Sequence, residues 1–212
     1  MSLFSRKKKL IVSGCSYTDD YATTQNLKPF PLWSELLAEK LDMECINVGK
    51  VAFGNKAIYS TLIDQVVSQK NVGLAISMWS EFQRVSFYMG EGNLPKGIDE
   101  KMLWSCFHPD RDYLEGEWHD QFYDDPEKNP AKKDYVYKVS KVIREQGLGG
   151  MKGGTYDSIR MMYSFQTICE SLDIPHLQVQ GCIPIMSKTG NRGQKELCHY
   201  ILDSCYLSLI HI

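Results

Sequence analysis

Several features that define common protein classes are missing from this sequence. None of its seven cysteines forms a Cys-x-x-Cys pair, which argues against a structural zinc site or a redox dithiol. No apolar run approaches the ~20 residues of a membrane span, and the apolar stretch after the basic start, residues 10–12, is too short for a secretion signal. The formal net charge is only −2, which does not favour a nucleic-acid groove. We expect a cytoplasmic protein with reduced cysteines, no metal or other cofactor, and no nucleic-acid or membrane partner.

The pattern that is present is an alternation of short apolar runs and helical periodicities. Expected strands cover residues 9–13, 44–49, 72–78 and 176–180, and expected helices cover residues 31–41, 55–70, 156–172 and 194–205. Strand–helix alternation at these lengths implies right-handed crossovers and a parallel sheet. We therefore predict a flavodoxin-like three-layer α/β/α fold, built as a single domain over residues 1–212.

The alternation is interrupted at about residues 85–154, where aromatic residues mix with Asp, Pro and Gly. This segment is predicted to be one large aromatic-rich insertion over one end of the sheet, partly helical at residues 134–146. The glycine-rich residues 147–155 are expected to be its flexible exit, because they lack the Gly-Lys-Ser/Thr ending of a phosphate loop.

The sharpest local signal is a Gly-x-Ser turn directly after the first expected strand, formed by Gly14, Cys15 and Ser16. Open α/β sheets bind their ligands at the carboxyl edge of the strands, where this turn places a hydroxyl. The turn is not the Gly-x-Ser-x-Gly elbow of the α/β-hydrolases, because position 18 is threonine.

Residues 14–17, Gly-Cys-Ser-Tyr, resemble the first sequence block of the SGNH (GDSL-like) hydrolases, and the continuation to threonine is similar to a phage-associated branch of that superfamily. The segments Asn-Val-Gly at 47–49 and Gly-Asn at 54–55 resemble the second block. After the third strand, most members of the superfamily carry Gly-x-Asn-Asp. This chain has Trp-Ser followed by an arginine at position 84, which is similar to the phage-associated branch. The resemblance covers roughly residues 10–84 and 156–181.

The resemblance implies acyl transfer with Ser16 as the nucleophile. A serine needs a histidine to take its proton and fixed donors to stabilise the oxyanion. By resemblance, the backbone amides of Ser16 and Gly54 would be two such donors. The family's asparagine donor is missing, and Ser80 is the nearest residue that could replace it.

The catalytic base is harder to place. The superfamily carries Asp-x-x-His in a loop after the last strand, and the one literal match here is Asp173 to His176. That segment also reads as the turn into a strand, which favours a structural role over a catalytic pair. His199 lies in an expected helix, whereas His108 and His119 lie among aspartates of the insertion, a pattern more typical of a solvated lid than of a metal site.

The last residues, 207–212, still read as helix and resemble the translation of a sequencing adapter. We therefore expect a truncated C-terminus, with the last ~6 residues not native and the family's Asp-x-x-His block lost after about Cys205.

The sequence thus predicts an SGNH-type serine esterase or acetylesterase acting on a small-molecule or carbohydrate ester. The alternative is a non-catalytic binding module of the same fold, such as a phage structural or assembly protein. A third hypothesis is a nucleotide-binding protein on a flavodoxin-like sheet. The sequence lacks the glycine or acidic fingerprint that such binding requires.

Overall fold

The computed structural model describes residues 7–19, 30–88, 104–107, 130–148, 150–181 and 209–210. Its centre is a five-stranded parallel sheet with the order β2-β1-β3-β6-β7. The strands are β1 (Lys9–Ser13), β2 (Glu44–Asn47), β3 (Val72–Trp79), β6 (His176–Gln180) and β7 (Leu209–Ile210). The predicted parallel α/β fold is therefore confirmed, and the first four strands match their expected ranges closely.

The helices form a layer on each face of the sheet. Helix α2 (Trp33–Lys40) covers one face, and helices α3 (Asn55–Ser68) and α7 (Gly150–Ser171) cover the other. Alternate residues of β1 divide between the two layers: Leu10 and Val12 pack in the α2 cluster, whereas Ile11 packs in the α3–α7 cluster. Because both faces are covered, the inner strands β1 and β3 are apolar along most of their length rather than on one side.

Each of these three helices is followed by a turn that uses a left-handed residue. Asp42, Asn71 and Asp173 have φ values of 50°, 65° and 54° just before β2, β3 and β6. Asp and Asn tolerate this conformation better than other non-glycine residues, because their short polar side chains bond to the local backbone. The local sequence therefore fixes where each helix stops and the next strand begins.

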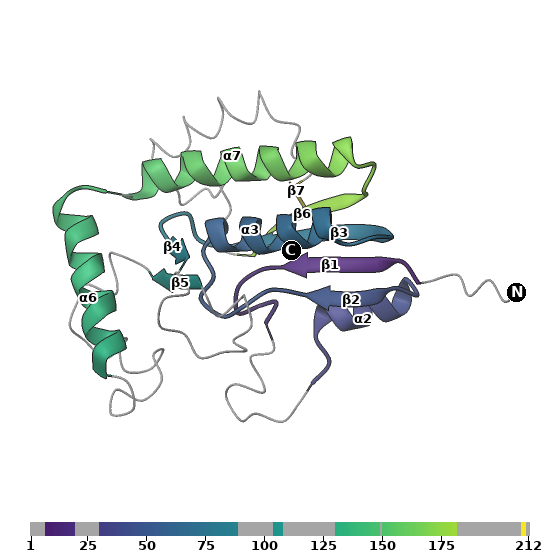
Figure 1. Ribbon diagram of the computed structural model, residues 1–212, viewed down its shortest axis with the longest axis horizontal. Coiled ribbons are helices and arrows are strands. Elements are labelled where there is room, and N and C mark those ends of the chain that lie inside the picture. The colour runs from purple at the N-terminus through teal and green to yellow at the C-terminus, as the bar shows by residue number, and fades with distance from the viewer. Residues whose placement is uncertain are drawn as a thin grey trace, which may run out of the picture.

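The described parts of the insertion lie beyond the carboxyl end of the sheet (Figure 1). Strands β4 (Val85–Tyr88) and β5 (Trp104–Phe107) pair antiparallel, and helix α6 (Pro130–Glu145) extends the helix expected at residues 134–146. Ile143 of α6 packs against Val85 of β4, which joins the helix to the β4–β5 pair. Most of the aromatic-rich stretch lies outside the described residues.

The prediction of a flexible exit at residues 147–155 is wrong for most of that segment. Helix α7 already begins at Gly150, and Gly147 is the only described glycine with a positive φ, 63°. Gly154 lies so close to the loop after β3 that a Cβ atom there would overlap the carbonyl oxygen of Phe82. The glycine at position 154 thus permits close packing of a helix rather than flexibility.

The end of the chain also differs from the expectation. Leu209 and Ile210 form β7 and pair in parallel with Gln178 and Val179 of β6, so the helical reading of residues 207–212 is wrong at these two positions. A short apolar run does not by itself distinguish an edge strand from a helix. The helix expected at residues 194–205 lies outside the described residues.

Candidate functional site

Ser16 lies in a single helical turn that follows β1 at the carboxyl end of the sheet. The amides of Thr18 and Asp19 both donate to the carbonyl oxygen of Cys15, at 2.9 and 3.1 Å. Ser16 is partly exposed and Tyr17 beside it is 64% exposed, whereas β1 itself is buried. The fold therefore presents the Ser16 side chain at the edge where open α/β sheets bind ligands.

Thr18 explains two of the glycines in the sequence motifs. Its side chain is fully buried between Gly14 and Gly49. A Cβ atom at Gly14 would overlap the Thr18 hydroxyl, and one at Gly49 would lie 2.9 Å from the Thr18 methyl group. The spacing from Gly14 to Thr18, together with the glycine after β2, is thus a packing requirement of the turn.

Hydrogen bonds from neighbouring elements hold the same turn. Asn47 Nδ2 at the end of β2 donates to the Thr18 carbonyl at 2.6 Å, and Trp33 Nε1 of α2 donates to the Tyr17 carbonyl at 2.9 Å. Asp19 Oδ2 accepts the amide of Val51 at 2.8 Å. Ser16 is therefore carried by a turn whose position is fixed on several sides, as a reacting group requires.

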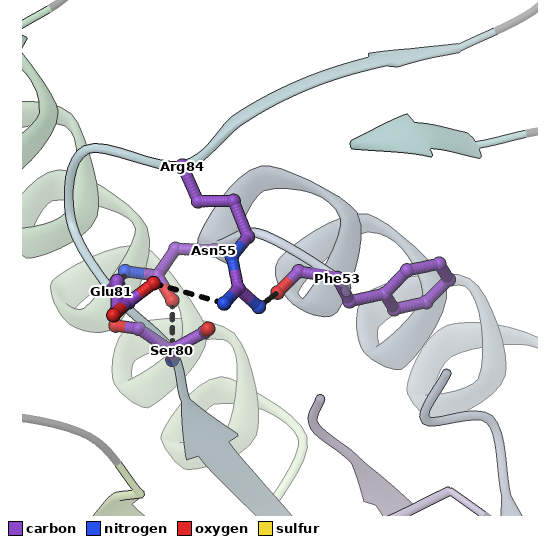
Figure 2. A network of polar contacts seen from close by, with 5 residues as sticks. All are labelled: Phe53, Asn55, Ser80, Glu81 and Arg84. Atoms are coloured by element: carbon purple, nitrogen blue, oxygen red, sulfur yellow. Dashed lines mark hydrogen bonds and ion pairs between the residues drawn. The ribbon is translucent and has the colours of Figure 1, made fainter. Parts of the chain in front are cut away.

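Asn55 ties together three elements beside this edge, and Figure 2 shows its contact with Ser80 just after β3. The side chain is buried and stands at the first position of α3. Asn55 Oδ1 accepts the Ser80 amide at 2.7 Å, and Nδ2 donates to the Ser80 carbonyl at 3.2 Å and to Ser158 Oγ of α7 at 2.8 Å. One amide group thus links the start of α3, the end of β3 and α7.

Arg84 forms a second link next to Asn55 (Figure 2). Its guanidinium donates to the Phe53 carbonyl at 3.1 Å and pairs with the Glu81 carboxylate at 2.9 Å. Both charged side chains are mostly buried, 17% and 15% exposed, so the pair is screened less by solvent than a surface pair. The arginine therefore joins the loop before α3 to the loop after β3.

The structure places Gly54 and Ser80 near the carboxyl edge but gives their amides other partners. Gly54 caps α3 and is covered by β4, since a Cβ atom there would lie 2.6 Å from Ser86 Oγ. The Gly54 amide donates towards the thiol of Cys106 in β5, and the Ser80 amide donates to Asn55. Ser80 could then donate to an oxyanion only through its hydroxyl, and Gly54 only if Cys106 moved away.

Cys106 itself does not supply a nucleophile in this arrangement. Burial raises the pKa of its thiol, an effect opposed by the hydrogen bond with Ser86, the Gly54 amide and the charges of Arg84 and Lys50. Because the net direction is upward, the protonated thiol is favoured at neutral pH, and it donates to Ser86 Oγ at 3.2 Å.

Asp173 and His176 are not brought to Ser16. Asp173 is exposed in the turn after α7, and His176 is the first residue of β6, at the amino end of that strand. Its backbone partner is Ala75, which in turn pairs with Ile11, and its ring stacks edge-on against Phe165 at 5.7 Å. This histidine is therefore a packed residue of the α3–α7 layer, two strands from β1. His108, His119 and His199 lie outside the described residues.

Sequence reasoning missed three residues that shape the site. Asp19 was not singled out, although a carboxylate one position after the Gly-x-Ser-x-Thr pattern is a usable signal for an anchored turn. Trp33 lies in the helix expected at residues 31–41, and the helical pattern carries no signal for its indole hydrogen bond. Ser158 carries no local signal, because its partner Asn55 is 103 residues away.

The loop between β2 and α3 holds a strained residue, Ala52, whose φ is 68°. An L-residue in this region costs about 1–2 kcal/mol, which glycine avoids. We expect Ala52→Gly to raise the free energy of unfolding by about 0.5–1 kcal/mol, after the extra chain entropy of glycine is subtracted. Chemical denaturation measures this. Ala38→Gly, at a helical position, should lower stability instead, and equal losses in both variants would contradict the strain.

Comparison with protein-family models gives no match to this chain, and comparison with curated proteins gives no significantly similar sequence. Within the described ranges, no group of three or more His, Cys, Asp or Glu side chains is arranged to hold a metal ion. Among the same residues, no helix combines the length and apolar character needed to cross a bilayer.

Proposed function

We propose that the chain is an SGNH-type serine ester hydrolase that forms an acyl-enzyme on Ser16. The observation that carries this proposal is the turn after β1: a partly exposed serine at the carboxyl end of an inner strand, in a turn held by the side chains of Trp33, Asn47 and Asp19. A fixed, accessible hydroxyl at this edge is what acyl transfer requires of the nucleophile.

In the proposed reaction, the Ser16 hydroxyl attacks the ester carbonyl, its proton passes to a base, and the alcohol leaves with a proton. The Ser16 amide, at the start of a helical turn whose first amides have no partner within the turn, would donate to the oxyanion. Gly54 would become a second donor only if Cys106 moved away from its amide. The base is not assigned, because His176 is packed against Phe165.

The substrate we propose is a polar ester, such as an acetylated carbohydrate. Tyr17 beside Ser16 is 64% exposed, and Tyr88 of β4 is 52% exposed and stacks edge-on with Trp104 of β5 at 5.4 Å. Flat aromatic rings at the same end of the sheet provide surfaces on which sugar faces stack. A cytoplasmic location belongs to this proposal, since the described cysteines, Cys15, Cys45, Cys106 and Cys169, are free thiols.

Labelling with a fluorophosphonate probe tests the nucleophile. The chain should form a phosphonylated adduct by loss of fluoride, and mass spectrometry should place it on Ser16. Ser16→Ala should lose all labelling, whereas Ser68→Ala, which removes an exposed serine of α3, should keep it. Labelling that survives Ser16→Ala would refute Ser16 as the nucleophile.

One observation favours a second candidate, a non-catalytic binding module of the same fold, such as a phage structural protein. The Gly54 amide, one of the expected oxyanion donors, is already engaged by Cys106. A folded chain that is neither labelled nor active on a panel of p-nitrophenyl esters, even when imidazole is added to serve as the base, would favour this module over the esterase.

A further inference from the structure

A row of polar side chains crosses the buried sheet just below the Ser16 turn. Ser13 of β1 pairs with Ser77 of β3, and Ser77 pairs with Gln178 of β6. All three are buried, with exposures of 0%, 0% and 1%. They stand two residues along from Ile11, Ala75 and His176, so they share the face of the sheet that α3 and α7 cover.

Two polar atoms of this row have no hydrogen-bond partner among the residues that the structure describes, Ser77 Oγ and Gln178 Nε2. The orientation of the Gln178 amide is settled by Trp79, whose Nε1 donates to Gln178 Oε1 at 2.9 Å. Because an indole N–H can only donate, the carbonyl oxygen must face Trp79, and the amide nitrogen must point elsewhere. Rotating the amide would place its NH2 group against the Trp79 N–H, and the indole would then lack an acceptor.

Ser13 contributes an acceptor to the same row. Its hydroxyl lies 3.0 Å from Thr61 Oγ1, and Thr61 donates its own proton to the Ala57 carbonyl at 2.9 Å. Ser13 is then the donor in the contact with Thr61, which leaves lone pairs on Ser13 Oγ to accept a further hydrogen bond. Neighbouring side chains therefore offer an unused amide donor, an unused hydroxyl and an unused acceptor.

We propose that this row binds one buried water molecule, held by Gln178 Nε2, Ser77 Oγ and Ser13 Oγ. The water accepts from the amide of Gln178, donates to Ser13 Oγ and exchanges a third hydrogen bond with Ser77 Oγ. Three bonds to otherwise unsatisfied groups are typical of an internal water. The site is independent of any chemistry at Ser16.

Such a water would fix the relative register of β1, β3 and β6. A shift of β6 by one residue would move Gln178 to the face that α2 covers, away from Ser77 and Ser13. The water needs all three partners at one level of the sheet, so it is lost in any other alignment.

A crystal structure of the chain tests the site directly. We expect a water within about 2.7–3.2 Å of Gln178 Nε2 and of both serine hydroxyls. A closed, water-free contact among these side chains would overturn the proposal.

A substitution gives a second test. The direction in which it changes the Tm differs between a row that binds the water and a row that does not. With the water present, Ser77→Ala removes one of its partners and should lower the Tm by about 2–4 °C. In a dry row the same change removes an unsatisfied hydroxyl and should raise the Tm. The matched control is Ser140→Ala in α6, another fully buried hydroxyl without a partner, which lies outside the row and should not lower the Tm. A Tm that rises in both variants would contradict the bound water.

Discussion

Gly154→Ala should lower the free energy of unfolding by about 3 kcal/mol or more, a loss typical of severe overpacking. The new methyl group would overlap the carbonyl oxygen of Phe82, and neither the interior of α7 nor the loop after β3 is a flexible side-chain end that can move aside. Urea denaturation followed by circular dichroism measures the change. A variant too unstable to fold would meet the same expectation.

The control for this substitution is the preceding glycine. Gly153 lies in the same helix, and nothing stands within 4 Å of a Cβ atom placed there. Gly153→Ala should therefore stabilise the protein by about 0.5–1 kcal/mol through helix propensity alone. If Gly154→Ala were as harmless as Gly153→Ala, the close approach of α7 to Phe82 would be refuted.

Asn55→Ala should cost about 3 kcal/mol. It leaves the Ser80 amide and carbonyl without their side-chain partner in a buried place, and each such loss typically costs 1–3 kcal/mol. Ser158→Ala removes only one of the three bonds of Asn55, because Asn55 Nδ2 keeps its contact with Ser80. This control should cost about 1 kcal/mol.

The ratio of these two losses, measured by denaturation in the same buffer, is the informative quantity. Equal losses for Asn55→Ala and Ser158→Ala would mean that the contact with α7 carries the stability and that the contact with Ser80 contributes little. If only Asn55→Ala lowered the free energy of unfolding, the hydrogen bonds between the start of α3 and the end of β3 would carry the stability.

Much of the sheet could be predicted because its signals are local. Residues 9–13 and 72–78 are short apolar runs bounded by polar or small residues, and they became β1 and β3 with ends that differ by one residue at most. The start of α7 could not be predicted in this way. A run of glycines indicates flexibility as readily as close packing, and only the position of Phe82, far away in sequence, decides between them.

In the candidate site, too, local features could be predicted and contacts between distant residues could not. The turn at Ser16 could be placed because a Gly-x-Ser pattern directly follows a strand. The partners of Asn55 could not, because Ser80 and Ser158 are 25 and 103 residues away and no periodicity encodes a hydrogen bond at that distance. The partners of the Gly54 and Ser80 amides were likewise beyond sequence reasoning, since each bond depends on how separate elements dock.

The contact between Gly154 and Phe82 also bears on how this protein can vary. The chain leaves the sheet after β3 and returns in α7 at nearly the same point, so the two ends of the branch between Phe82 and Gly154 are held together. Once these ends are held by the core itself, lengthening or shortening the branch changes the entropy of loop closure only slowly. The parallel sheet and the turn at Ser16 can therefore stay the same while those parts of the branch that do not contact the core change in length.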